Sequence, residues 1–167
     1  MKKFFYGIIA SFAIISVSLG IYFGNLLYIA KPGFYVSKEP VNLSLKQKSK
    51  ILEALIKLSD LTNLVGQEKY SALFLGSAGV VCSNSGALMI ESKYLFSKAI
   101  TLAKSYGERT GDFHPFMESR FTFALHLKDV GEIDSAKQVV TETLAFANSK
   151  DPGNYWIGNF ERLSLKL

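Results

Sequence analysis

Few side chains in this sequence have the type and spacing that catalysis or metal binding requires. The two histidines are His114 and His126, and the only cysteine is Cys82. Asp112 and His114 form one i, i+2 pair, which supplies too few ligands for a zinc site. Cys82 follows two valines, so we expect a buried thiol rather than a nucleophile. We expect His114 to be a loop residue before a proline and His126 to be half-buried on a helix.

Motifs for other chemistry are also missing from the sequence. The glycines of Leu75–Gly79 flank the wrong positions for a nucleophile elbow, and no Walker loop or dinucleotide fingerprint occurs. The lysines are scattered rather than interleaved with aromatic residues, which argues against nucleic-acid binding. The sequence therefore predicts no catalytic residue, metal site or cofactor, and we expect a protein that is not an enzyme.

Composition limits the class of protein. The chain has 167 residues, 49% of them hydrophobic, with one cysteine, four prolines and a net charge of +5. Collagen, low-complexity disorder and a disulfide-stapled miniprotein are excluded because glycine, proline and cysteine are too scarce. The length suits one modest domain with an appendage.

The appendage lies at the amino end. Residues 4–30 contain no charged side chain, and Lys2 and Lys3 precede them. A bilayer core needs about 20 helical residues, so this run is long enough to span one. We expect an uncleaved membrane anchor over residues 1–30. The alternative is a signal peptide, for which Ser18-Leu19-Gly20 is the only tolerable cleavage site.

Two features of the sequence favour opposite orientations of this anchor in the membrane. Lys2 and Lys3 favour a cytoplasmic amino end, and long domains translocate largely regardless of charge. Lysines beyond residue 30 favour the opposite orientation. We expect a single-pass protein, in a bacterial inner membrane, with its carboxyl-terminal domain exported to the periplasm. Among those lysines, Lys46, Lys48 and Lys50 form either a solvated helix face or a contact with anionic lipid headgroups.

The rest of the chain is predicted to be all-α, with a linker at 31–43 and a domain of about six helices at 44–167. Ser44 and Gln47 form a capping box, and Gly66 ends the helix that they begin. The apolar spacing then predicts helices over 68–82, 87–106, 115–130 and 133–147, and a short last helix carrying Trp156. We expect Gly107 to end the helix over 87–106, with a loop from Glu108 to His114, and Gly131 to end the helix over 115–130. The helix over 68–82 is apolar on nearly every side, so we expect protein around it.

The helices over 115–130 and 133–147 carry a pattern of large and small residues with a turn glycine. These residues are Phe123, Ala124, Leu127, Gly131, Ala136, Val140 and Thr143. A small side chain at Ala136 allows two antiparallel helices to approach closely. The pattern resembles a tetratricopeptide repeat. A looser copy precedes it at Gly79, Val80, Ser83, Ala87, Ser92, Phe96 and Ala99.

Two features depart from that family. Ser92 and Ala136 are 44 residues apart, whereas the family's repeat is about 34 residues. The family's aromatic residue in each first helix is replaced by Gly76 and Arg120. A generic helical bundle is the alternative interpretation.

The resemblance implies a concave groove that binds an amphipathic helix or peptide segment of a partner protein. The groove positions of the family map onto Phe74, Ser77, Val81, Glu118, Phe121, Leu125 and Lys128. Phe121 and Leu125 either line this groove or are covered by the amino-terminal helix. We therefore expect a membrane-anchored interaction module, an adaptor or assembly factor. The alternatives are a dedicated inhibitor of the immunity type and an enzyme subunit.

Overall fold

The computed structural model describes residues 2–34, 43–83 and 89–167, and over these residues the protein is all-α. The element order is α1 (Lys2–Ala30), a short 3-10 helix η1 (Lys31–Phe34), α2 (Leu45–Leu64), α3 (Glu68–Ser83), α4 (Met89–Thr110), α5 (His114–Asp129), α6 (Ile133–Lys150) and α7 (Ile157–Ser164). The prediction of an all-α fold is confirmed, and the described part holds six α-helices after the first.

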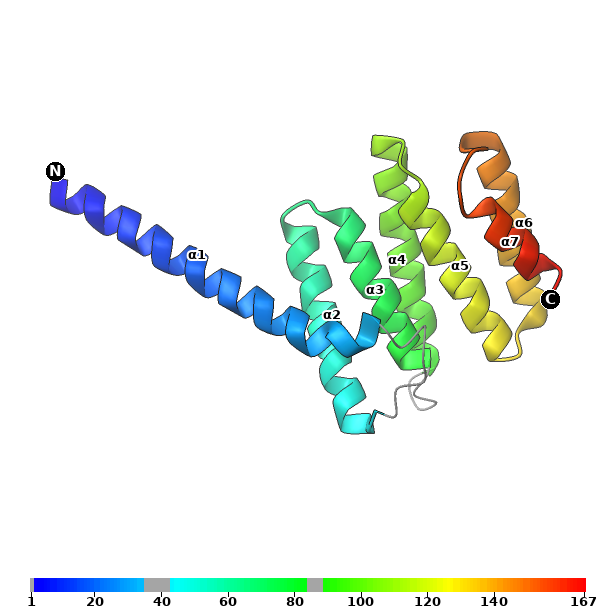
Figure 1. Ribbon diagram of the computed structural model, residues 1–167, viewed down its shortest axis with the longest axis horizontal. Helices are drawn as coiled ribbons and strands as arrows, with labels where there is room; N and C mark the ends of the chain where they lie inside the picture. The colour runs from blue at the N-terminus through cyan, green and yellow to red at the C-terminus, as the bar shows by residue number, and fades with distance from the viewer. Residues whose placement is uncertain (1, 35–42, 84–88) are drawn as a thin grey trace.

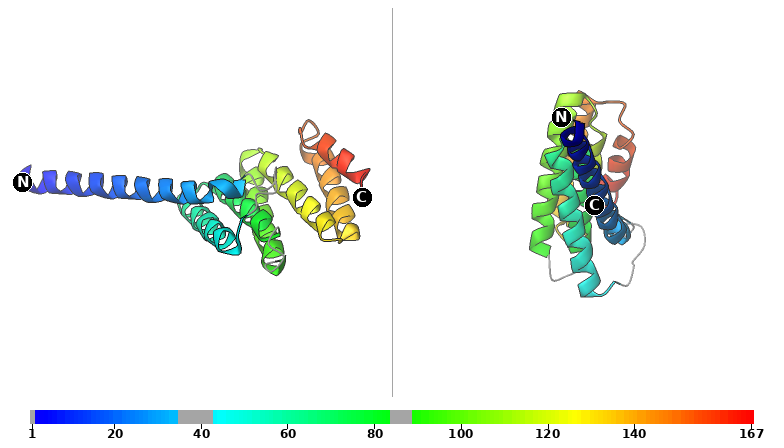
Figure 2. Two further views of the ribbon diagram at one scale, coloured as in Figure 1. Left: turned by 60° about the horizontal axis from the view of Figure 1, so that its bottom comes forward. Right: turned by 90° about the vertical axis from the view of Figure 1, so that its left-hand side faces the viewer.

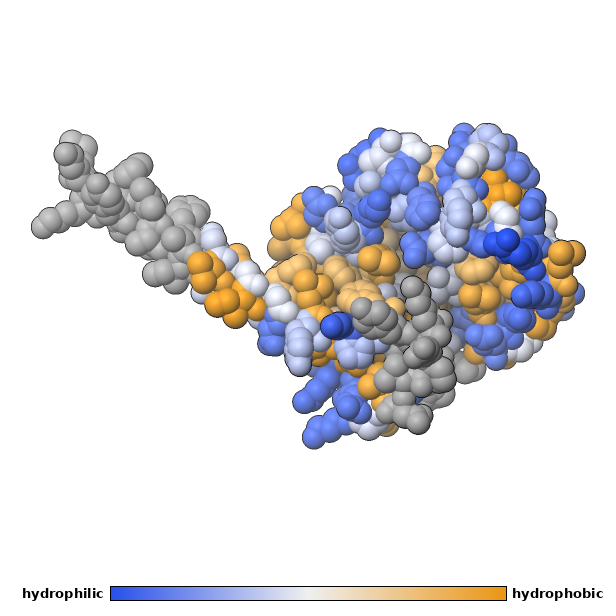
Figure 3. Space-filling view, in the orientation of Figure 1, coloured by the Kyte–Doolittle hydropathy of each residue, from blue (hydrophilic) through white to orange (hydrophobic). Residues whose placement is uncertain are grey.

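Helices that follow one another along the chain pack side by side from α2 to α7, as Figure 1 shows. Most of α1 extends away from this array. Figures 1 and 2 show that α1 leaves the array beside α2. Val17, Leu19 and Ile21 on the extended part of α1 are 62%, 57% and 68% exposed. Figure 3 shows this apolar surface on the coloured part of α1, which is the part nearer the other helices. Among the described residues, no helix has both the length and the apolar character needed to cross a membrane.

Local sequence signals set several helix ends. The Ser44 hydroxyl accepts a hydrogen bond from the Gln47 backbone N–H at 3.3 Å, and Gln47 Oε1 accepts from the Ser44 backbone N–H at 2.9 Å. These two bonds satisfy donors that the first turn of α2 leaves open. Gly66 and Gly131 follow α2 and α5 with φ of +75° and +82°, a conformation that glycine adopts without a Cβ penalty. The predicted capping box and both glycine stops are confirmed.

One predicted helix end is wrong. The sequence predicted that Gly107 ends the helix that begins near residue 87, with a loop to His114. Instead α4 continues to Thr110, and Gly111 provides the stop with φ of +80°. The reason lies in packing: a Cβ at Gly107 would lie 2.4 Å from Cδ1 of Phe113. Gly107 is therefore a site of close approach inside the helix.

A first hydrophobic core joins the end of α1 to α2, α3 and α4. Leu26 and Ala30 of α1 are 5% and 0% exposed, and they belong to one buried cluster with Leu55 and Leu58 of α2. The element η1 lies closely against α2, because a Cβ at Gly33 would be 2.7 Å from Cγ2 of Ile51. The rest of the predicted linker, residues 35–42, lies outside the described residues.

A second core lies among α4, α5, α6 and α7. It contains most of the residues on which the repeat pattern depends: Ala124, Leu127, Ala136, Val140 and Thr143 are all at most 2% exposed. In the preceding hairpin Ser92, Phe96 and Ala99 are fully buried, whereas Ala87 lies outside the described residues. Most of the described residues of the pattern are thus buried in both hairpins, whereas Val80, Ser83 and Phe123 are half-buried.

Candidate functional site

A hollow of about 330 Å³ lies between α3 and α5, and η1 contributes Gly33 and Phe34 to its lining. We call it the central hollow. Its lining consists of Gly33, Phe34, Lys69, Tyr70, Ala72, Leu73, Gly76, Ser77, Val80, His114, Pro115, Glu118, Ser119 and Thr122. The apolar side chains come chiefly from η1 and α3, and α5 contributes most of the polar ones. Such a surface offers an apolar floor beside hydrogen-bonding groups.

On α3, the structure places only one of the three predicted groove residues in the central hollow. Ser77 lines it. Phe74 and Val81 are 5% and 1% exposed and belong to the first core, where Phe74 packs against Phe34 with ring centroids 5.8 Å apart. The open stripe of α3 instead passes through Leu73 and Val80. The open stripe thus lies one residue before the predicted positions. One residue corresponds to a rotation of about 100° around the helix axis, away from the face that the resemblance indicated.

On α5, Glu118 lines the central hollow, and Phe121, Leu125 and Lys128 lie outside it. Phe121 is half-buried by α7: its ring centroid lies 5.2 Å from that of Trp156 and 5.3 Å from that of Phe160. Leu125 and Lys128 are also half-buried. The helix that covers Phe121 is therefore the last one, and not the amino-terminal one. The predicted groove is occupied by η1 near Phe74 and by α7 near Phe121, and the central hollow is the open part between them.

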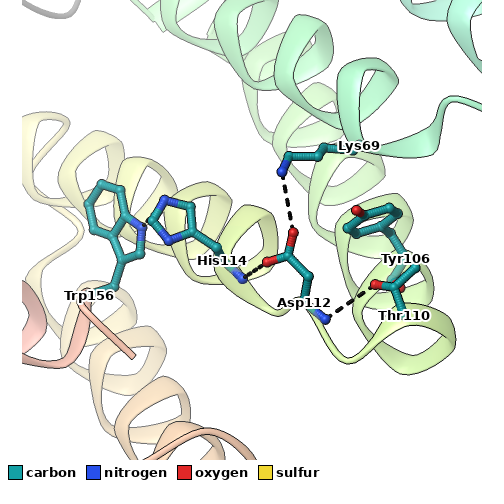
Figure 4. A network of polar contacts seen from close by, with 6 residues as sticks. All are labelled: Lys69, Tyr106, Thr110, Asp112, His114 and Trp156. Atoms are coloured by element: carbon teal, nitrogen blue, oxygen red, sulfur yellow. Dashed lines mark hydrogen bonds and ion pairs between the residues drawn. The ribbon is translucent and has the colours of Figure 1, made fainter. Parts of the chain in front are cut away.

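A polar network borders the central hollow where α5 begins (Figure 4). Lys69 Nζ lies 3.3 Å from Oδ2 of Asp112, and Oδ1 of Asp112 accepts a bond from the His114 backbone N–H at 3.1 Å. The indole N–H of Trp156 donates to Nε2 of His114 at 3.2 Å, so the neutral ring carries its proton on Nδ1. Burial opposes ionisation of Asp112, but the His114 N–H and the Lys69 ammonium outweigh it and lower the pKa of Asp112. This network ties α3, α5 and the chain before α7 together at the rim.

The remaining chemistry-bearing residues lie in the interior. His126 is 3% exposed, and Cys82 is fully buried, which raises the pKa of its thiol to about 11. A thiol with that pKa is protonated at neutral pH and is a poor nucleophile. Cys82 is thus buried as predicted, and His126 is more deeply buried than predicted. In the part of the chain that the structure describes, no three histidine, cysteine or acidic side chains converge as metal ligands.

Sequence reasoning missed Leu73, Gly76 and Thr122 as lining residues. Gly76 is the most informative of them, because the tetratricopeptide resemblance places an aromatic residue at this position and a Cβ here would meet no heavy atom within 4 Å. The loss of a large side chain from a helix face was a signal for open space. The other position where the aromatic residue is replaced holds Arg120, whose side chain is engaged with α6. Its guanidinium donates to Oγ1 of Thr143 at 2.8 Å and to Oε2 of Glu142 at 2.9 Å.

Comparisons with known proteins add no relative. A search of protein-family models, of curated proteins and of solved structures finds no match to this chain.

Proposed function

We propose that this protein is a membrane-anchored protein–protein interaction module, an adaptor or assembly factor, that holds a segment of a partner protein in its central hollow. The observation that carries the proposal is the hollow itself. It remains open between α3 and α5, and its lining combines Phe34 and Leu73 with Ser77 and Glu118. An apolar centre with polar groups around it suits an amphipathic helix or an extended peptide.

The charge of the lining indicates one property of that segment. Glu118 lines the central hollow, and among the described residues no basic side chain lies within ion-pair distance of it. The other charged pair at the rim, Lys69 with Asp112, is already neutralised. A partner segment with apolar residues and one lysine or arginine therefore complements the surface best.

The tetratricopeptide-like architecture is part of the same proposal. Support comes from the burial of Ala124, Ala136 and Thr143, each 0% exposed, at the positions where such repeats need small residues. Two hairpins are fewer than the three repeats that usually give a stable array. The end of α1 with α2 covers one end of the stack, and α7 covers the other. These flanking helices supply the burial that missing repeats would otherwise provide.

The membrane anchor is proposed from the sequence of α1. Residues 4–30 carry no charge, and they belong to one continuous helix of 29 residues. The end of that helix packs into the first core from Phe23 onward. The part before it, from Phe4 to Tyr22, is about 28 Å long at 1.5 Å per residue, close to the thickness of a bilayer core. We propose an inner-membrane location with the domain exported, which reporters fused after Leu167 would test.

The experiment for the central hollow uses the full chain in its native cells. A photoactivatable residue replaces Ser77, and the yield of a discrete crosslinked adduct is measured with and without Gly76→Leu. The leucine enters open space in the hollow. Its matched control is Gly158→Leu on α7, where a Cβ also meets no atom within 4 Å.

We expect Gly76→Leu to reduce the adduct at least about fivefold, because loss of one well-packed contact costs roughly 1 to 3 kcal/mol. Gly158→Leu should leave the yield unchanged. A complete absence of adduct, or an equal yield from the two variants, would contradict binding in the central hollow.

A further inference from the structure

We propose that a second hollow, where α1 meets α2, binds the phosphate headgroup of an anionic membrane lipid. This junction hollow has a volume of about 420 Å³. Lys31 and Lys50 lie in its lining with Tyr28 and Gln47 as further hydrogen-bonding groups, and Ile29 and Ile51 form an apolar wall. The proposal rests on the membrane anchor proposed above.

The charged residues that line the junction hollow, among those the structure describes, are both lysines. Lys31 and Lys50 are both exposed, and no carboxylate of the described residues lies within ion-pair distance of either. Lys46 is exposed one turn before Lys50 on the same helix face. The first acidic residue of α2 is Glu53, which pairs with Lys57 at 2.7 Å. Two ammonium groups and a phenol lie at one hollow, and none of the described carboxylates compensates them, so the site suits a phosphate group.

The position of the junction hollow indicates a lipid as the source of that phosphate. It lies at the end of α1, and α2 is the helix of the domain next to the extended part of α1 (Figures 1 and 2). If the membrane-spanning part ends at Tyr22, then Tyr28 and Lys31 follow about 9 Å and 13 Å further along the helix axis. The headgroup layer is roughly 5 to 8 Å deep on each side of the bilayer, and a lysine side chain extends into it.

The apolar side chains of the junction hollow support the same assignment. Tyr28 is 78% exposed, and tyrosine rings favour the membrane–water interface. Ile29 and Ile51 would contact the carbon atoms of the headgroup beside the phosphate. Free phosphate would gain nothing from this wall. A lipid with a negatively charged headgroup uses both the lysines and the isoleucines.

The test uses the full chain in detergent with equal amounts of phosphatidylglycerol and phosphatidylcholine, and native mass spectrometry measures the ratio of the two lipids bound. The variant Lys31→Gln/Lys50→Gln removes the two lysines. Lys137→Gln/Lys150→Gln changes the net charge equally at two exposed positions of α6. Flotation of all three proteins with phosphatidylcholine vesicles separately measures anchoring.

We expect the wild type to prefer phosphatidylglycerol by about 25-fold, because each of the two lysines near the surface contributes roughly a fivefold preference. The junction variant should lose this preference, and the α6 variant should keep it. If all proteins float and none prefers phosphatidylglycerol, or if both variants lose the preference equally, the headgroup site is wrong and the anchor stands. If none floats, the anchor is wrong and the headgroup site fails with it.

Discussion

His126 is the residue at which three helices meet. Its Nδ1 lies 2.6 Å from the Ser83 hydroxyl of α3, and its Nε2 lies 3.0 Å from the Ser92 hydroxyl of α4. A neutral imidazole has one donor and one acceptor, and a serine hydroxyl serves as either. Both ring nitrogens are therefore satisfied without a charge. Burial, reinforced by the nearby Lys93 ammonium, lowers the pKa of His126.

This lowered pKa predicts how stability depends on pH. In the unfolded chain His126 titrates near 6.5, and in the folded chain it titrates lower. Well above pH 6.5 the imidazole is neutral in both states, so the contribution is fully present. Below it the unfolded state binds the proton first, and the free energy of unfolding falls by up to about 1 kcal/mol between pH 6.5 and 5.5.

Urea unfolding of the full chain at pH 7.5, 6.5 and 5.5 measures this dependence. His126→Gln lowers stability at pH 7.5 and should flatten the decline below pH 6.5. An identical decline in the wild type and in His126→Gln would assign the pH dependence to other groups.

Single residues were predicted best where their role depends on near neighbours in the chain. The Ser44 cap needs only Gln47, and the burial of Cys82 follows from the valines before it. The partners of His126 come from segments more than 30 residues away, so no local pattern could indicate them. The same limit applies to Phe121, whose cover comes from α7.

At the scale of elements, the hairpin α5–α6 depends on a small residue where its helices cross. Ala136 is fully buried in the second core. Ala136→Leu would force a larger side chain into that contact and lower the free energy of unfolding by about 1 to 3 kcal/mol. Ala145→Leu is the matched control, because Ala145 is exposed on the same helix. Equal unfolding midpoints in urea for the two variants would place the crossing elsewhere.

The helix α1 has two parts with different expected behaviour. Leu26 is 5% exposed in the first core, whereas Leu19 is 57% exposed. Leu26→Ala should lower the free energy of unfolding by about 2 to 5 kcal/mol, and Leu19→Ala should leave it unchanged. Unfolding of the full chain in detergent, followed by circular dichroism, compares the two variants. If both lower stability equally, α1 does not end in the domain core.

Helix ends were predicted where glycine, proline or a capping residue decides them locally. Pro115 lies in the first turn of α5 as expected, and Gly131 follows the end of that helix. Gly107 misled the prediction because a glycine inside a helix and a glycine after a helix look alike in sequence. Only the ring of Phe113, which returns against Gly107 beyond the end of α4, distinguishes them.

At the scale of the whole molecule, the array of stacked helices is closed at both ends by its own chain and open in the middle. The all-α class and the order of the helices could be predicted from apolar spacing, because that spacing reports which face of each helix is buried. The open face could be predicted only to within one helix position. Which residues of α3 and α5 line the central hollow depends on the orientation of each helix about its own axis. Packing between residues far apart in the sequence determines that orientation.

Occupancy of the central hollow in living cells tests the account most directly. Ser77→Cys places a thiol in the hollow, and the native Cys82 gives little background because it is buried and protonated. Ser97→Cys, at an exposed position of α4, is the control. The measurement is the rate of N-ethylmaleimide labelling of each thiol in purified protein and in intact cells. We predict that Ser77→Cys reacts at least about fivefold more slowly in cells relative to Ser97→Cys, because a bound partner segment covers it. The same relative rate in cells and in purified protein would show an empty hollow and contradict the account.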